Sequence, residues 1–347
     1  MINLESDYNN GLHPLILQKL IVTNKEKLSG YGFDKYSNLA KEKIKKWIGK
    51  ENAVVELLVG GTQTNMIVIS TMLKDYEGVI AANTGHISLH EAGAIEYTGH
   101  KVIELDSENG KLLISALEKY VEDFYKDENH DHMVFPGMVY LSYPTEYGTL
   151  YTKEELIKIS SICKKHQMIL YIDGARLGYG LASLECDLKI EDIASLCDVF
   201  YIGGTKVGAL CGEAVVFTKN NRPRNFLTSI KRRGALLAKG RLLGAQFDAL
   251  FTDGLYLKIS RHAIDMAMQL KKIIKKYNVP FYIDSPTNQQ FIIVNNKQLD
   301  LLKKEVGYSF WETLNNDKTV IRLVTSWDTT NEDLEKLDLV FNNIFNK

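Results

Sequence analysis

Short apolar runs alternate with helical stretches through the first two-thirds of the chain, and this alternation limits the possible folds more than any other feature. The runs are AVVELLV (53–59), VIAA (79–82), KVIEL (101–105), MVYLSY (138–143), MILYID (168–173) and DVFYIGG (198–204). AVVELLV is uninterrupted, which is typical of a strand buried on both faces. Repeated strand–helix units predict an α/β domain with a mostly parallel sheet flanked by helices.

One of the helices between these runs has clear boundary signals. Thr152 and Glu155 have the spacing of a capping box, which satisfies the free N–H groups of a first helical turn. Leu156, Ile159 and Cys163 then fall on one face of the helix. This segment is therefore predicted to cover the sheet as an amphipathic helix.

The last third of the chain has a different pattern. A long helical stretch from about Arg241 to Lys276 has Leu255, Ile259, His262 and Met266 on one face. Three β-rich runs follow, and a closing helix is expected from Thr330. These runs are FYID (281–284), QQFIIVN (289–295) and TVIRLVTSW (319–327). The predicted division is an N-terminal arm (1–15), a large domain (16–248) and a smaller C-terminal α+β domain (249–347).

Composition excludes several classes of protein. The 347 residues carry 42 Lys and Arg against 43 Asp and Glu, a net charge of −1, whereas a general nucleic-acid binder has a basic excess. Neither an apolar run of about 18 residues nor a signal-like start is present, so no membrane association is expected. The four cysteines lack C-x-x-C spacing, which indicates buried thiols in a cytoplasmic protein.

Ligands of open α/β sheets bind at the carboxyl ends of the strands, so the residues there are candidate site residues. Gly60, Gly61 and Thr62 follow the first run and open a helix. Glycine lets the backbone approach a ligand closely, and a helix N-terminus favours a phosphate group. A strand-to-helix turn also needs glycine for conformational reasons, so this turn does not decide the ligand by itself.

Two further strand ends carry charged residues. Asp173 closes the MILYID run, where a carboxylate needs a partner, and Arg176 is expected to be that partner. Thr205 and Lys206 follow the DVFYIGG run. Burial lowers the pKa of a lysine and makes its amine available for a Schiff base. The alternative is a lysine that extends to the surface.

A histidine follows the VIAA run. His86 can stack on a ring, act as a base or cap a turn, and His90 lies four residues further on. The pair lacks the carboxylate of an H-E-x-x-H zinc motif, so no metal is expected. One cofactor needs a phosphate turn, a lysine, a carboxylate and a stacking group together, and that cofactor is pyridoxal phosphate.

Five segments strengthen this interpretation. GGTQTN, GHISLHEAGAIE, DGARLG, YIGGTKVGA and IRLVTSW, in this order, resemble the threonine aldolase/β-eliminating lyase family of fold-type I pyridoxal-phosphate enzymes. The resemblance runs from LESD (4–7) to the region of Arg322, nearly the whole chain. It implies the fold of these transferase-like enzymes, with a large cofactor-binding domain and a small C-terminal domain.

The family's roles map onto matching residues. The resemblance implies that Lys206 forms the internal aldimine, that Asp173 pairs with the pyridine nitrogen, and that His86 stacks on the ring. Arg176 corresponds to the residue that contacts the phenolic oxygen and the substrate side. The other implied cofactor contacts are Gly60, Gly61, Thr62 and Thr205.

Substrate-binding roles follow from the same resemblance. Arg322 matches the arginine that binds the substrate carboxylate, for which a bidentate guanidinium is suited. Ser6 matches a serine near that carboxylate. Groups from a neighbouring subunit complete the site in relatives, and Tyr31 and Lys231, the latter a cofactor contact, are the candidates here. A homodimer or homotetramer with shared active sites is expected.

One departure from the family concerns the reaction. Aldolases usually carry a histidine in an N-T-H segment, and here Glu146 stands in its place, within YPTEYG (143–148). The lysine loop also reads GGTK instead of SK. The resemblance implies a lyase that cleaves the Cα–Cβ bond of a small β-hydroxy-α-amino acid, giving glycine and acetaldehyde from threonine or allo-threonine, with Glu146 or His86 as base. The alternative is β-elimination, racemisation or transamination of another amino acid on the same cofactor.

Overall fold

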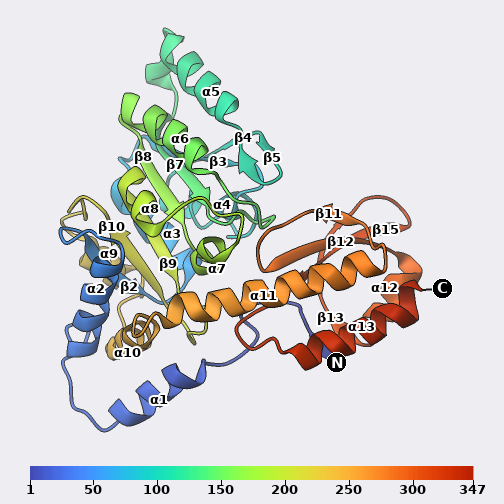
Figure 1. Ribbon diagram of the computed structural model, residues 1–347. Coiled ribbons are helices and arrows are strands. Elements are labelled where there is room, and N and C mark those ends of the chain that lie inside the picture. The colour runs from blue at the N-terminus through green and yellow to red at the C-terminus, as the bar shows by residue number, and fades with distance from the viewer. Residues whose placement is uncertain (347) are drawn as a thin grey trace.

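The computed structural model describes residues 1–346, and its two main sheets lie apart from each other (Figure 1). The larger sheet has seven strands in the order β2-β10-β9-β8-β7-β3-β4. Their bounds are Val54–Leu58 (β2), Glu77–Ala82 (β3), Val102–Leu105 (β4), Phe135–Ser142 (β7), Ile169–Asp173 (β8), Val199–Gly203 (β9) and Glu213–Phe217 (β10). Neighbours from β9 to β4 are parallel, whereas β10 is antiparallel to β9 and β2. The predicted mostly parallel sheet is confirmed.

Two details of this sheet differ from the expectation. Each predicted run contains a strand, but β2 lies at the end of the strand order, and only Val55 and Leu58 are buried in it. A strand at the edge has fewer neighbours to cover it, so the expected burial on both faces was wrong. Strand β10 was not predicted, although its apolar part, AVVF, is four residues long like the predicted VIAA run.

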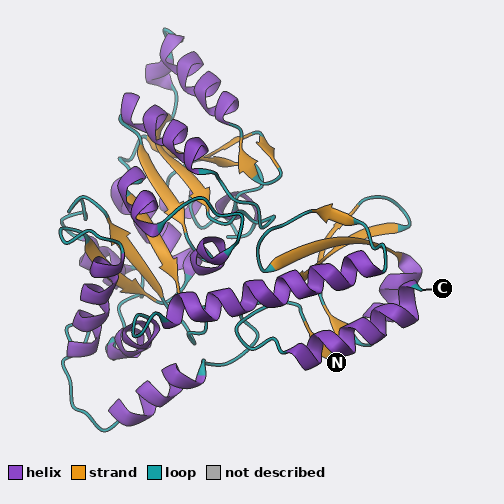
Figure 2. Cartoon of the chain, in the orientation of Figure 1, coloured by secondary structure: helices purple, strands orange, loops and turns teal. Residues whose placement is uncertain are grey.

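Helices cover both faces of the sheet (Figure 2). In β8, Leu170 and Ile172 face a core shared with α5, α6 and α8, whereas Tyr171 faces a core shared with α3 and α9. This alternation follows from the two-residue period of a strand. The helices of this part are Pro14–Thr23 (α1), Lys35–Trp47 (α2), Gly61–Met72 (α3), His86–Leu89 (α4), Ile114–Lys126 (α5), Lys153–Lys165 (α6), Leu177–Ala182 (α7), Ile190–Leu196 (α8), Phe226–Arg232 (α9) and Arg241–Leu250 (α10).

The amphipathic helix predicted from the capping box is α6. The Thr152 hydroxyl accepts the Glu155 N–H and the Glu155 carboxylate accepts the Thr152 N–H, at 3.2 and 2.7 Å. Leu156, Ile159 and Cys163 are buried against the sheet. Both the start and the buried face of this helix are confirmed.

The C-terminal part combines a sheet with helices, as predicted; the sheet is antiparallel, and its strand Ser309–Thr313 was not predicted. Its strands, in the order β11-β12-β15-β14, are Phe281–Ile283 (β11), Gln289–Asn295 (β12), Lys318–Val324 (β15) and Ser309–Thr313 (β14). Leu255–Lys276 (α11), Asn296–Leu302 (α12) and Asn331–Phe345 (α13) pack on it, and α13 starts after Thr330 as expected. The long helix predicted from Arg241 is broken between α10 and α11, where Asp253 and Gly254 have φ of 49° and 68°.

The N-terminal residues connect the two parts. Ile2–Asn3 (β1) pairs in parallel with Val306–Gly307 (β13), and Val324 donates its N–H to the Leu4 carbonyl at 2.8 Å. The next residues, including Asp7, run toward the large sheet. Ser107–Glu108 (β5) and Lys111–Leu112 (β6) form a separate hairpin. Among residues 1–346, no helix has the length and apolar character needed to cross a bilayer.

Candidate active site

The loops after β2, β3, β7, β8 and β9 meet at the carboxyl end of the large sheet and enclose a cavity of about 220 Å³. The predicted site residues that line it are Gly60, Gly61, Thr62, His86, Glu146, Asp173, Arg176, Thr205 and Lys206. A wider outer cavity of about 560 Å³ shares His86, Glu146, Arg176 and Lys206 with it and extends to Arg322. The structure therefore brings most of the predicted site together.

Three predicted site residues line neither cavity. Ser6 is buried in the N-terminal arm, and its hydroxyl has no hydrogen-bond partner among the described residues. The Lys231 amine lies 5.0 Å from the centre of the Tyr31 ring, and this pair is away from Lys206. The roles implied for these residues, two of them in a neighbouring subunit, stay predictions.

Asp173 ends β8 and is buried among hydrogen-bond donors. Its carboxylate accepts the Tyr140 hydroxyl, the Asn65 amide at 3.0 Å and the Ala175 N–H at 3.0 Å. Burial alone raises the pKa of a carboxyl, but nearby His86 and these side-chain hydrogen bonds lower the pKa of Asp173 below its ordinary value. Asp173 is therefore a carboxylate at neutral pH.

The expectation that Arg176 pairs with Asp173 was wrong. Arg176 instead makes a bidentate ion pair with Asp7 of the N-terminal arm, at 2.7 and 3.0 Å. Asn288, next to β12, donates its amide to the same Asp7 carboxylate at 2.9 Å. Arg176 therefore ties the arm, the large sheet and the small sheet together beside the cavity, while Asp173 obtains its hydrogen bonds from neutral donors.

Lys206 lies in the loop between β9 and β10 and faces both cavities. Burial and the nearby Arg176 lower the pKa of its amine, although Asp7 and Asp173 oppose the shift. The Lys206 carbonyl accepts the Tyr179 hydroxyl, which anchors the loop. The lysine thus reaches the cavity instead of extending into solvent, which was the alternative left open by the sequence.

His86 is the first residue of α4 and is held from behind by a buried carboxylate. The distance from His86 Nδ1 to Glu91 Oε1 is 2.7 Å. Asn65 donates its amide to Glu91 Oε1 and to Asp173 Oδ2, at 2.7 and 3.0 Å, and the Tyr171 hydroxyl fixes the orientation of that amide. This chain joins His86 to Asp173 through Glu91 and Asn65.

Glu146 lies between the two cavities and is buried. Burial raises the pKa of its carboxyl, although a hydrogen bond from Ser142 and the nearby His86 oppose the shift. The neutral, protonated form is therefore more populated for Glu146 than for an exposed glutamate.

The glycine turn after β2 leads directly into α3. Gly60 is the N-cap of α3 and makes no side-chain cap hydrogen bond, and a Cβ on Gly61 would lie 3.2 Å from the Tyr201 hydroxyl. The first-turn N–H groups of a helix have no partner within the helix, so here they remain for a ligand. Glu213 is paired with Leu58 at the end of β2 and therefore lies next to this turn, and Thr205 lines the same cavity.

Arg322 on β15 forms the far wall of the outer cavity. Its guanidinium donates to Gln289 at 2.9 Å and Ser309 at 3.2 Å, and lies 5.5 Å from the centre of the Trp311 ring. Its Nε is buried without a partner among the described residues. Burial and the nearby Arg176 lower the pKa of Arg322 to about 10, so it remains a cation with an unused donor.

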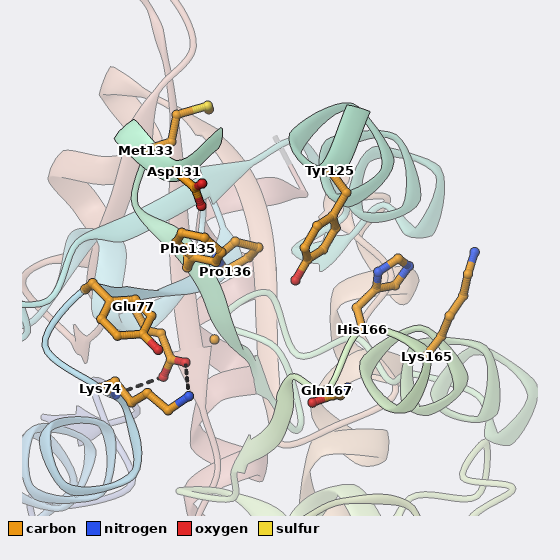
Figure 3. Close-up of a pocket in the computed structure, with 12 residues that line it drawn as sticks. Lys74, Glu77, Tyr125, Asp131, Met133, Phe135, Pro136, Lys165, His166 and Gln167 are labelled. Carbon is orange, nitrogen blue, oxygen red and sulfur yellow. Dashed lines mark hydrogen bonds and ion pairs between the residues drawn. The ribbon is translucent and has the colours of Figure 1, made fainter. Parts of the chain in front are cut away.

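A larger cavity, of about 660 Å³, lies at the amino end of the same sheet (Figure 3). Tyr125 and His166 stack there with ring centres 5.4 Å apart, and Lys74 pairs with Glu77. None of the predicted site residues lines it. Size alone therefore does not identify the active site.

Several residues of the site were not predicted. Asn65, Glu91 and Asp7 stand inside the segments GGTQTN, GHISLHEAGAIE and LESD, but no role was assigned to them. The sequence signals for Tyr140 and Glu213 were weaker. Tyr140 is a polar group inside an apolar strand, and Glu213 is an acid at the start of another strand. Their positions become informative only when neighbouring strands are known.

A mostly parallel sheet with a lysine and a carboxylate at its carboxyl end, followed by a small antiparallel domain, defines the fold-type I class of pyridoxal-phosphate enzymes. Within this class, the family model described as beta-eliminating lyase matches residues 18–297. The chain belongs to the beta-eliminating lyase family.

Similar proteins include named threonine aldolases. The chain is 39% identical to a Leishmania major threonine aldolase structure, with a TM-score of 0.96 and coverage of 99% of this chain and 100% of that one. It is 28% identical to a low specificity L-threonine aldolase of Pseudomonas sp. over 96% of this chain and 94% of the relative. A putative L-allo-threonine aldolase structure from Listeria monocytogenes shares the fold, with 19% identity, a TM-score of 0.77 and coverage of 99% and 96%.

Proposed function

We propose that this protein is a pyridoxal-phosphate-dependent aldehyde-lyase that cleaves the Cα–Cβ bond of a β-hydroxy-α-amino acid. Threonine or allo-threonine would give glycine and acetaldehyde. The observation that carries the proposal is that Lys206 and Asp173 line one cavity of about 220 Å³ whose wall includes the open first turn of α3. The similarity to threonine aldolases over nearly the whole chain supports the choice of reaction.

The residues of the inner cavity fit the cofactor. When bound, pyridoxal phosphate supplies an aldehyde for an amine and a protonated ring that accepts electrons from the substrate. Lys206 provides an amine with a lowered pKa, and Asp173 provides a carboxylate that would hold a proton on the ring nitrogen. His86 would stack on the ring, and Arg176 would contact its phenolic oxygen. The phosphate would meet Gly60, Gly61, Thr62 and Thr205.

The outer cavity fits the amino acid substrate. Arg322 has a buried Nε without a partner, and a substrate carboxylate would satisfy this donor. We assign Ser6 and Arg176 to the same end of the substrate. Lys206 and Arg322 both line this cavity, so they hold the substrate from two sides.

The geometry favours His86 as the base for the β-hydroxyl proton. Because Glu91 occupies Nδ1, that nitrogen carries the proton of the neutral ring and Nε2 is left as an acceptor. Glu146 has a raised pKa, so in its neutral form it orients the hydroxyl by hydrogen bonding. His86 accepts the proton directly or through water while the Cα–Cβ bond breaks.

A substrate panel tests the proposal. Purified protein with added cofactor is incubated with L-threonine, L-allo-threonine and phenylserine, and aldehyde and keto acid are measured separately. Aldehyde formed together with glycine supports the lyase. Keto acid without aldehyde would instead support elimination or transamination, and change of optical rotation without either product would support racemisation.

We further propose that the protein is a homodimer or homotetramer with shared active sites, to which Tyr31 and Lys231 contribute from a second copy. The exposed apolar side chains of α1 and the following loop support this: Leu15, Leu17, Ile21, Val22 and Phe33. Helix α1 lies at the margin of the molecule, where a second copy has access (Figure 1). Sedimentation analysis measures the assembly, and a monomer that is fully active would contradict it.

Two further proposals concern the division into domains and the cellular location. The arm (1–15), the large domain (16–248) and the small domain (249–347) are supported by α11, whose first half packs in the large core and whose second half packs in the small one. A cytoplasmic location is supported by the four cysteines, all of which are free thiols. Limited proteolysis and cell fractionation test these two statements.

A further inference from the structure

Glu213 is a buried acid at the cofactor cavity that the lyase mechanism above does not use. Its side chain is 4% exposed, at the start of β10, and it lines the inner cavity with the α3 turn and Lys206. None of the cations among the described residues lies within ion-pair distance of it. A buried carboxylate without a counter-charge is costly, so this position needs an explanation.

The hydrogen bonds of Glu213 connect it to the loop before Lys206. The Thr205 hydroxyl donates to Glu213 Oε1 at 2.8 Å, and the Gly204 N–H lies 3.3 Å from Oε2. The Thr205 oxygen also accepts the Gly212 N–H at 3.0 Å. With Glu213 ionised, the single hydroxyl proton of Thr205 is therefore directed at the carboxylate and away from the phosphate site.

A protonated Glu213 reverses this arrangement. A hydroxyl group has one donor and two acceptor positions. The Thr205 oxygen can accept from the Gly212 N–H and from a carboxylic acid at Glu213, which leaves its own proton for a third group. A phosphate bound against Gly61 and Thr62 would be that third group.

We propose that Glu213 is a positioning residue for the cofactor phosphate: as a neutral acid it donates to Thr205, so that the Thr205 hydroxyl donates to the phosphate. The inference rests on the proposed cofactor site. It makes phosphate binding and protonation of Glu213 mutually favourable, since a second anion at this place repels an ionised carboxyl.

The surroundings of Glu213 set the pH range of this effect. Burial raises its pKa to about 8, although the Thr205 hydrogen bond and nearby Lys206 oppose the shift and Asp173 adds to it. The other ionisable groups that face Glu213 are Tyr171 of β8, Tyr201 of β9, Cys211 of the lysine loop and Tyr256 of α11. Burial raises the pKa of each of these four, so they stay neutral where Glu213 titrates.

Phosphate binding should therefore weaken as the pH rises through the pKa of Glu213. Below about pH 8 the free protein already holds the proton, so binding needs no proton uptake. Above that pH, one proton must be taken up with each phosphate, and the affinity falls by about tenfold per pH unit until the pKa of the complex is passed. An anion next to Glu213 raises that second pKa further.

The test measures binding instead of turnover. Pyridoxamine 5′-phosphate has the phosphate but no aldehyde, so it does not react with Lys206. Its dissociation constant is measured calorimetrically from about pH 6.5 to about pH 9.5, in buffers of different ionisation enthalpy, to give the proton uptake. Wild type is compared with Glu213→Gln, a neutral side chain that donates to Thr205, and with Thr205→Ala. Pyridoxamine without phosphate is the control ligand.

The expected wild-type result is a loss of about tenfold in affinity per pH unit above pH 8, with uptake of up to one proton. Glu213→Gln should bind as tightly as wild type does at low pH and keep that affinity at high pH. Thr205→Ala should bind more weakly at low pH and show a smaller Glu213-linked decrease, because only the repulsion between the phosphate and an ionised Glu213 remains. Pyridoxamine should lack the Glu213-linked decrease.

An unchanged pH slope in Glu213→Gln, or wild-type binding without proton uptake above pH 8, would overturn the inference. The uptake measurement needs no variant, so it decides the question even where a substitution impairs folding. Failure of pyridoxamine 5′-phosphate to bind at any pH would overturn the proposed cofactor site as well. Binding with a flat pH profile would overturn this inference alone.

Discussion

The two ends of the large sheet carry cavities of opposite character. At the carboxyl end, a cavity of about 220 Å³ contains the buried acids Asp173 and Glu213 next to Lys206. At the amino end, a cavity of about 660 Å³ contains the Lys74–Glu77 pair, whose lysine side chain is 67% exposed (Figure 3). The smaller cavity holds ionisable groups whose pKa values are shifted by burial and by specific partners, a property that marks functional sites better than volume does.

The largest effect should come from the lysine at the carboxyl end. Lys206→Ala removes the amine proposed to bond the cofactor, so aldehyde release should fall by at least about 10³-fold and the visible colour of the bound cofactor should change. Rates and absorbance spectra measure both. Lys74→Ala, a lysine change at the amino end, is the matched control. Equal losses in the two variants would remove the distinction between the cavities.

The next effect should come from Asp173, the carboxylate proposed to pair with the ring nitrogen of the cofactor. Asp173→Asn keeps the size and one acceptor oxygen but loses the charge that would hold a proton on that nitrogen. We expect kcat to fall by about 10²–10³-fold, the scale of losing one preorganised electrostatic group, while cofactor still binds. Steady-state kinetics and an absorbance titration separate these quantities. Normal turnover would mean that the ring proton does not depend on Asp173.

The sequence predicts some of the strands and site residues of the molecule and misses others. Strand positions follow from the apolar runs because burial sets the two-residue pattern locally. Asp173 was found because it ends such a run, and Lys206 because it follows one closely. Strand β10 was missed although its apolar run is as long as VIAA, so Glu213 had no predicted position in the sheet. The break at Asp253 and Gly254 was missed because helical periodicity continues across it.

Partners distant in sequence were the main failure. Arg176 lies three residues from Asp173 but pairs with Asp7, which is 169 residues away. Asn65 bridges Glu91 and Asp173, and that contact exists only because α3 crosses behind β8. Proximity in the chain is weak evidence for an ion pair at the end of a strand, where the side chains of several loops converge.

A smaller effect is expected from a change at Glu91, which contacts His86 but not the substrate cavity. Glu91→Gln keeps the shape and an acceptor oxygen for Nδ1–H of His86, but it loses the negative charge that strengthens this hydrogen bond and favours the proton on Nδ1. Loss of such a supporting partner typically costs about 10–100-fold. We expect this loss in kcat with little change in KM, because Glu91 does not line the substrate cavity. An unchanged kcat would show that His86 needs no support, and Glu146 would then be the better candidate for the base.

The smallest effect should come from the corresponding change at the amino end. The Glu77 carboxylate accepts the Lys74 N–H at 2.8 Å and lies 3.6 Å from the Lys74 amine. Glu77→Gln keeps an acceptor oxygen for that N–H and loses only an exposed ion pair, so the free energy of unfolding should change by less than about 1 kcal/mol. Denaturant unfolding measures stability and aldehyde release measures activity, which should stay within about twofold of wild type. A loss of turnover as large as that of Glu91→Gln, without a loss of stability, would connect the amino-end cavity to catalysis and contradict the assignment of the chemistry to one end of the sheet.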